Sequence, residues 1–468
     1  MLINDLRNGG KIILMLGTDN VAVALEKVLE NFGNNILFWD PGGSGGVQYK
    51  SETSTSTAVE DIDAYPLESA DCLILSQRLF FGGNDFLERF GKRIKKLEER
   101  VFLDVEIIKV LFYENKFIAI VGDSYIKVIH AALCHIFEST PRQAILLPSG
   151  VGGYPEIGED GSESGLNLRS SNVFLMSLNG QNIQYLKNTD FDLVAVLSPE
   201  SEQDVPSMER LLSKQAIGGV SIINVDNSNL KEFWSSPRSG NSATVLIPLS
   251  TDKMIENGYS YINETIYNYY DSNSSYDLAN SGLIGSGINR LSVLLSFIVA
   301  TRFGLDPSEI TANLRLFQGM PGNMECVRRG SDGVLFVNNL CAETMDALES
   351  PFNMYKGIYA ILVTNGKMGE AIVNLRNHRD SIKSIFLVDT FDMLDPKAEE
   401  FSGLNTEKVK DLEEAVSIVR SLINNNKNGD EGLEEEFVVL ASPIYSDKMN
   451  NIHYRIPGEE FRRVVEGL

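Results

Sequence analysis

The chain has 468 residues, 43% hydrophobic and 22% charged, a composition typical of globular proteins of two to four domains. Its 41 basic and 64 acidic side chains give a formal net charge of −23, which disfavours binding to nucleic acids and anionic membranes. The four cysteines form no CxxC pair and the four histidines do not cluster, so neither a disulfide framework nor a zinc site is expected. Because the sequence shows no signal peptide and no apolar run of membrane-spanning length, we expect a cytoplasmic protein.

The first block of the chain alternates strands and helices. Residues 11–16, 36–39 and 72–75 are short apolar runs predicted as buried strands, and residues 22–31 have a helical pattern that Gly33 closes. Strands separated by helical segments predict parallel βαβ units with right-handed crossovers.

A second block begins near Tyr113, with a buried strand over 117–121, a glycine at Gly122 and a helix that continues to residue 137. Further strands are predicted at residues 144–147, 173–176, 193–197, 220–224 and 244–247.

Helices of the second block are predicted at 207–215 and 288–303. Asp306 and Pro307 predict the start of another, because aspartate is a preferred N-cap and proline favours the first helical position. The polar residues 271–281 are expected to form a surface loop.

A third α/β block begins around Gly319, and residues 424–436 are expected to form a polar loop within it. Its predicted strands are residues 334–338, 359–364, 385–388 and 437–441, and its predicted helices are residues 344–348, 412–423 and 459–465. All three blocks therefore predict an α/β protein.

The strand–glycine–helix unit around Gly122 is the frame in which phosphate-binding loops occur. A helix N-terminus offers free backbone N–H groups and the positive end of a dipole to an anion. A phosphate loop places a second glycine, a lysine and a hydroxyl residue at the start of the helix. Here Tyr125, Ile126 and Lys127 stand at those positions.

Three stretches of the chain resemble a known family. Residues 197–215 contain, in the family's order, a proline, the start of a helix and a lysine. Residues 319–338 keep Pro321 and Glu325 of the family's proline-histidine-arginine-x-glutamate pattern. Residues 440–461 match the family's C-terminal segment without gaps. The chain resembles the muramyl (Mur) ligases of peptidoglycan synthesis, in particular those that add D-glutamate to UDP-N-acetylmuramoyl-L-alanine.

The resemblance implies a three-domain α/β architecture. Residues 1–112 would form a Rossmann-like domain for the UDP-linked substrate, residues 113–318 a P-loop-like ATPase domain, and residues 319–468 a Rossmann-like C-terminal domain. It also implies a monomer that uses ATP and magnesium to join UDP-N-acetylmuramoyl-L-alanine to D-glutamate.

The resemblance assigns roles to individual residues. Lys214 falls on the lysine that the family carboxylates, so it would be catalytic and, as a carbamate, would interact with magnesium; an exposed helix lysine is the alternative. The other implied contacts are to ATP, for Gly122, Ser124, Lys127 and Asn289, and to the substrates, for Asp40, Lys367, Ser446 and Tyr454. Asp40 could equally be an ordinary turn former.

Substitutions at charged positions leave two functions open. Ile126 replaces the loop lysine, Tyr125 adds bulk where glycine lets a phosphate approach, and Met176 replaces a magnesium-binding glutamate. The first function is a working ligase that uses Lys127 and Lys214, and the second is a catalytically silent binding or scaffold protein. A dinucleotide-binding oxidoreductase is disfavoured, because Asp19 and Ala22 interrupt the glycine turn after the first strand.

Overall fold

The computed structural model describes most of the chain, and the account below concerns those residues. They are residues 3–17, 20–39, 57–59, 62, 65–76, 79, 86–147, 172–187, 190–198, 205–213, 215–230, 245–278, 287–317, 319–320, 322–329, 333–342, 348–349, 351–352, 355–364, 371–372, 375–389, 395–397, 401–427, 437–443, 445–446 and 451–468. Two compact units are present, residues 1–262 with 267–275, and residues 263–266 with 276–468.

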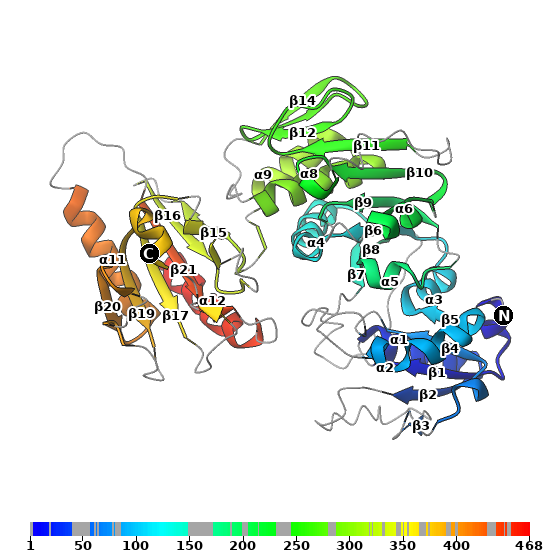
Figure 1. Cartoon of the computed structure of the whole chain (residues 1–468). Helices are drawn as coiled ribbons and strands as arrows, with labels where there is room; N and C mark the ends of the chain where they lie inside the picture. The colour runs from blue at the N-terminus through cyan, green and yellow to red at the C-terminus, as the bar shows by residue number, and fades with distance from the viewer. Residues whose placement is uncertain are drawn as a thin grey trace. The chain divides into compact units, whose positions relative to one another are not determined.

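The N-terminal part contains a five-stranded parallel sheet in the order β3-β2-β1-β4-β5 (Figure 1). Its strands are β1 (Ile12–Leu16), β2 (Asn35–Trp39), β3 (Thr57–Ala58), β4 (Cys72–Leu75) and β5 (Val101–Leu103). The helices are η1 (Ile3–Asn8), α1 (Asn20–Asn31), η2 (Leu67–Ser69), α2 (Phe86–Lys96), η4 (Glu98–Arg100) and α3 (Asp104–Leu111). The three predicted strands and the predicted helix are confirmed.

A nine-stranded sheet follows, in the order β14-β13-β12-β11-β10-β9-β6-β8-β7. Neighbours from β12 to β7 pair in parallel. The strands are β6 (Lys116–Val121), β7 (Ala144–Leu147), β8 (Val173–Leu178), β9 (Phe191–Val196), β10 (Gln215–Asn224), β11 (Val245–Ser250), β12 (Tyr259–Ile262), β13 (Thr265–Asn268) and β14 (Ser274–Asp277). The helices of this region are α4 (Asp123–Phe137), α5 (Gly180–Ile183), α6 (Val205–Ser213), α8 (Gly287–Arg302) and α9 (Pro307–Leu316).

The third sheet has the order β15-β16-β21-β17-β19-β20, and only its edge strand β15 pairs antiparallel. The strands are β15 (Glu325–Arg329), β16 (Val334–Asn338), β17 (Ile358–Val363), β19 (Ile382–Val388), β20 (Thr406–Val409) and β21 (Phe437–Pro443). Strands β18 (Ala371–Ile372) and β22 (Tyr445–Ser446) form a separate antiparallel pair. The helices are η6 (Leu375–Ser381), α11 (Leu412–Lys427) and α12 (Asn451–Glu466).

Side-chain alternation along the third sheet builds a core on each face. Leu335 and Val337 pack into one buried cluster, while Val334 and Phe336 pack into the other. This two-sided burial is typical of parallel sheets covered by helices. The three large sheets confirm the predicted α/β class and its three-part architecture, whereas the boundaries at residues 112/113 and 318/319 stay predictions.

Several elements differ from expectation. The helix predicted at 207–215 ends at Ser213, and Gln215 opens β10, where its side-chain amide donates to the Val220 carbonyl at 2.6 Å across an irregular register. Residues 274–277 of the expected surface loop form a strand. Helix α11 continues to Lys427, into the expected polar loop.

Helix α12 begins eight residues earlier than predicted, and Pro457 lies inside it. Of the helix predicted at 344–348, only Leu348 lies within the described residues. In the described part of the chain, no helix combines the length and apolar character needed to cross a bilayer.

Candidate functional site

The junction between β6 and α4 is the centre of the candidate site. Strand β6 lies inside the central sheet between β8 and β9, so its carboxyl end lies where open α/β sheets bind ligands. Gly122 is the single residue between strand and helix, with φ of 132° and ψ of 84°, a conformation that favours glycine. The Leu197 N–H donates to the Val121 carbonyl at 2.9 Å, which fixes the end of the strand beside β9.

The first turn of α4 occupies the stretch where a phosphate loop would be. The Tyr125 N–H donates to the Gly122 carbonyl at 3.1 Å, so the chain turns into the helix immediately after the strand. A Cβ added to Gly122 would lie 3.0 Å from the Tyr125 ring carbon Cδ2, which places that ring against the glycine. Ile126 is completely buried.

These features do not fit a magnesium-bound triphosphate. A phosphate loop surrounds the anion with several backbone N–H groups and directs a lysine at it. Here a one-residue connection, an aromatic ring and a buried aliphatic side chain stand in that place. Lys127 is half-buried in the same turn and already interacts with its surroundings.

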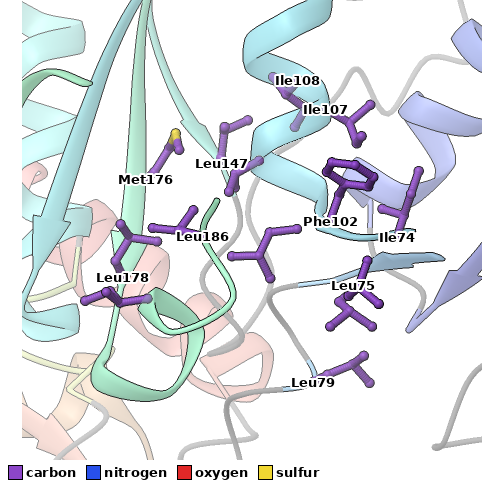
Figure 2. Packing of buried hydrophobic residues seen from close by; sticks show 14 of the residues in the cluster. Ile74, Leu75, Leu79, Phe102, Ile107, Ile108, Leu147, Met176, Leu178 and Leu186 are labelled. Atoms are coloured by element: carbon purple, nitrogen blue, oxygen red, sulfur yellow. The ribbon is translucent and has the colours of Figure 1, made fainter. Parts of the chain in front are cut away.

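Met176, at the position where the resemblance implies a magnesium ligand, belongs to the hydrophobic core. It is fully buried in β8, with Ala119 of β6 and Leu147 of β7 as its register partners. Figure 2 shows Met176 with Leu147, Leu178 and Leu186 on one side, and Leu75 of the N-terminal sheet in the same packed region.

One group of these buried side chains is named the apolar junction cluster here: Leu75, Leu79, Leu147, Met176, Leu178 and Leu186. Among the described residues, no group of three or more histidine, cysteine, aspartate or glutamate side chains could hold a metal ion.

The remaining predicted site residues are described only in part. Lys214, Asp40 and Lys367 lie outside the described residues. Ser124, Asn289 and Tyr454 lie in α4, α8 and α12, where their backbone alone is described, and Ser446 pairs with Ala371 in the small sheet. The structure therefore brings together Gly122, Ser124 and Lys127 on one strand–helix unit, and the grouping of the others stays a prediction.

A polar edge that was not predicted lies at the carboxyl ends of β9, β10 and β11. The Asp226 carboxylate accepts a hydrogen bond from the Thr251 N–H at 2.6 Å and another from the Ser250 hydroxyl. The Asn224 amide donates to the Leu197 carbonyl at 3.0 Å. The signal in the sequence is a polar residue at the end of each of two strands, Asn224 in β10 and Ser250 in β11.

A second unpredicted network surrounds Glu325, the glutamate retained in the 319–338 stretch. Its buried carboxylate accepts from the Gly322 N–H at 2.9 Å and the Asn338 amide at 3.1 Å, and pairs with Arg462 of α12. The Asn338 amide also donates to the Gly458 carbonyl at 3.2 Å. The two retained sequence stretches are thus joined to each other, which gives Glu325 a structural role.

Buried titratable groups near the N-terminal sheet also have structural roles. Burial raises the pKa of the Cys72 thiol to about 12, with Lys187 opposing the shift, so this thiol stays protonated and unreactive. Burial lowers the pKa of Lys187, against the attraction of Glu106. The Glu106 carboxylate accepts from the Lys187 N–H at 2.8 Å and from the Leu103 N–H at 3.1 Å, which ties α3 to the segment after α5.

Comparison with known proteins gives matches in sequence and in fold, although no protein-family model matches the chain. A UDP-N-acetylmuramoylalanine--D-glutamate ligase of Rickettsia bellii is 24% identical over 249 residues, 53% of each chain. The Rickettsia prowazekii enzyme of the same name is 22% identical over 254 residues, 51% of this chain and 54% of that one. The chain spans about half the length of the curated relatives it matches.

The UDP-N-acetylmuramate-alanine ligase MurC of Thermotoga maritima has a similar structure, with a TM-score of 0.50 and 10% identity over 98% of this chain and 99% of that one. At this identity the likeness concerns the fold. The sheets and the strand–glycine–helix unit therefore define an α/β protein with the Mur ligase fold. The two sequence matches, at 24% and 22% identity over about half of the chain, support the same family resemblance.

Proposed function

We propose that this chain is a diverged, D-glutamate-ligase-like member of the Mur family that has lost magnesium-ATP turnover and acts as a binding or scaffold protein. The observation that carries the proposal is the β6–α4 junction, where Gly122 is the only connecting residue and Tyr125 and Ile126 occupy the first turn of the helix. UDP-N-acetylmuramoyl-L-alanine is the ligand that we propose it retains, with Asp40 as a contact.

The electrostatic argument supports the same proposal. A chain of net charge −23 can hold a triphosphate only where local cations and backbone N–H groups outweigh the overall field. Loss of one preorganised charge contact typically costs about 3–4 kcal/mol of transition-state stabilisation. A lysine and a metal-binding glutamate are replaced by Ile126 and Met176, both fully buried, so these losses would combine.

A working D-glutamate ligase is the second candidate, and the match to the Rickettsia enzymes favours it. In that case Lys127, half-buried in the first turn of α4, would supply the missing cation, and a carboxylated Lys214 would be catalytic. The family's other contacts would come from Ser124 and Asn289 for ATP. Lys367, Ser446 and Tyr454 would then hold D-glutamate.

Two measurements on the purified chain separate these functions. The first is phosphate release from magnesium-ATP in the presence of UDP-N-acetylmuramoyl-L-alanine, with and without D-glutamate. The second is the shift in thermal unfolding with each ligand alone, because a ligand at about 100 times its Kd adds about 2.7 kcal/mol to the stability of the native state.

We expect no D-glutamate-dependent phosphate release, no shift with magnesium-ATP, and an upward shift with the muramyl precursor. Release of phosphate that depends on D-glutamate would overturn the silent assignment and establish the ligase. A chain that responds to neither ligand would refute the proposed precursor binding. The family resemblance further implies a cytoplasmic monomer, and light scattering of the purified chain tests the oligomeric state.

A further inference from the structure

Helix α2 carries a concentration of positive charge in an acidic protein. The eleven residues Phe86–Lys96 include five basic side chains and one acidic, a net charge of +4 in a chain of net charge −23. The basic residues that are exposed are Arg89, Lys92, Lys95 and Lys96, and we call these four the basic face.

The opposite side of α2 fixes the helix to the N-terminal core. Phe90 and Ile94 are each 1% exposed, and the Phe90 ring meets the Trp39 ring edge-on at 5.6 Å. Arg93 also holds the helix in place, since its guanidinium donates to the Tyr65 carbonyl at 2.9 Å. The basic face is therefore presented on a helix whose described apolar side chains, Phe90 and Ile94, pack into the core.

The lysines of the basic face are available to a partner. Lys92, Lys95 and Lys96 are spaced three and four residues apart, so they lie on one side of the helix. Within the described residues, no ion pair involves any of the three.

We propose that the basic face of α2 is a docking surface for a short acidic segment of a partner protein. The size of the surface decides the class of partner. Fixed charges act over about 8–10 Å at physiological salt, so a short peptide would meet the basic face without meeting the rest of the acidic surface. A bilayer or a nucleic acid is extended and would be repelled by that surface, because the chain as a whole has a net charge of −23.

The test uses the full chain and a fluorescein-labelled oligoglutamate peptide, with fluorescence anisotropy as the measurement. The variant K92E/K95E/K96E reverses the basic face. The matched control K253E/K356E/K397E makes the same change in net charge at three exposed lysines that lie far apart in the sequence. We expect the first variant to bind at least about tenfold more weakly than the unaltered chain, and the control to stay within about threefold, since exposed ion pairs contribute about 0.2–1 kcal/mol each.

Equal weakening in both variants would assign the effect to net charge and overturn the proposal. Absence of peptide binding to the unaltered chain, or tighter binding to anionic phosphatidylserine vesicles or to an oligonucleotide, would overturn it as well. Thermal unfolding verifies that each variant folds, and K92Q/K95Q/K96Q, which only neutralises the face, replaces the first variant if that one does not. None of these outcomes depends on whether the chain binds ATP.

Discussion

Replacement of Met176 by glutamate distinguishes a core position from a metal site. Glutamate is the residue that the family resemblance implies here, so a retained metal site would accept it. In this structure Met176 is fully buried in the apolar junction cluster (Figure 2). A carboxyl group in such surroundings remains protonated, because burial raises its pKa.

The magnitude follows from that shift. Full burial raises a carboxyl pKa by about 3–5 units, so the folded glutamate stays protonated at neutral pH. Protonating it costs about 1.36 kcal/mol for each pH unit above its ordinary pKa of about 4.3, so Met176→Glu should lower the free energy of unfolding by about 3–4 kcal/mol at pH 7. Whole domains are stable by only about 5–15 kcal/mol. Met176→Leu, the matched control that preserves volume, should cost less than about 1.5 kcal/mol.

Urea unfolding of both variants at two pH values measures this difference. The unfolded glutamate ionises above its ordinary pKa of about 4.3, whereas the folded one stays protonated, so the penalty is largest at neutral pH and narrows as the pH falls towards that value. Equal stability of the two variants at neutral pH would refute the assignment of Met176 to the core. Stabilisation of the glutamate variant alone by magnesium would refute it too.

Three further outcomes are expected. Ile126→Lys should lower the free energy of unfolding, measured with urea, by at least about 3 kcal/mol, because it buries an ammonium group, and it should not create ATP binding. Lys127→Ala should lower it by under about 1 kcal/mol. A rise in the stability of Ile126→Lys on addition of ATP would contradict this prediction. Gly322→Ala should lower the free energy of unfolding by about 1–2 kcal/mol, because Gly322 has a φ of 73°, and by more because the new Cβ would lie 2.5 Å from the Cys341 Sγ. If the double variant Gly322→Ala/Cys341→Ala does not recover part of the loss in Tm, the clash with Cys341 is excluded. Burial lowers the pKa of His130, and the contact of its Nε2 with the Ala144 carbonyl partly offsets this shift. The neutral imidazole therefore contributes fully to the free energy of unfolding above about pH 6.5, and this contribution is lost as the pH falls below that value. The free energy of unfolding of His130→Gln should depend less on pH than that of the unaltered chain, and an equal dependence would refute the role of His130.

Elements whose signals are local could be predicted from the sequence. The helix predicted at 288–303 is α8, and the Asp306 side chain accepts from the Ser308 and Glu309 N–H groups at the start of α9, as its N-cap position predicts. The strand–glycine–helix unit at Gly122 was predicted correctly for the same reason, since a buried strand, a glycine and an amphipathic helix follow one another without interruption.

Elements that depend on tertiary contacts could not be predicted. Proline usually ends a helix, yet α12 continues through Pro457, and the Arg462 and Gly458 contacts hold that helix against β15 and β16. Strand β10 begins at Gln215, whose side-chain amide donates to the Val220 carbonyl in the same strand, a contact that local propensity does not encode.

The candidate site divides in the same way. The substitutions at residues 125 and 126 were evident from the sequence, and the structure adds that they close the first turn of α4 against Gly122. The Asp226 edge was missed, because its bonds to Ser250 and Thr251 join residues 24 and 25 positions apart.

The central claim is that no magnesium triphosphate is held where β6 meets α4, and isothermal titration of the purified chain with magnesium-ATP tests it most directly. The account predicts no saturable binding, for the unaltered chain and for Lys127→Ala alike. Saturable binding at one site per chain that Lys127→Ala abolishes would contradict it, because the first turn of α4 would then be a working phosphate site.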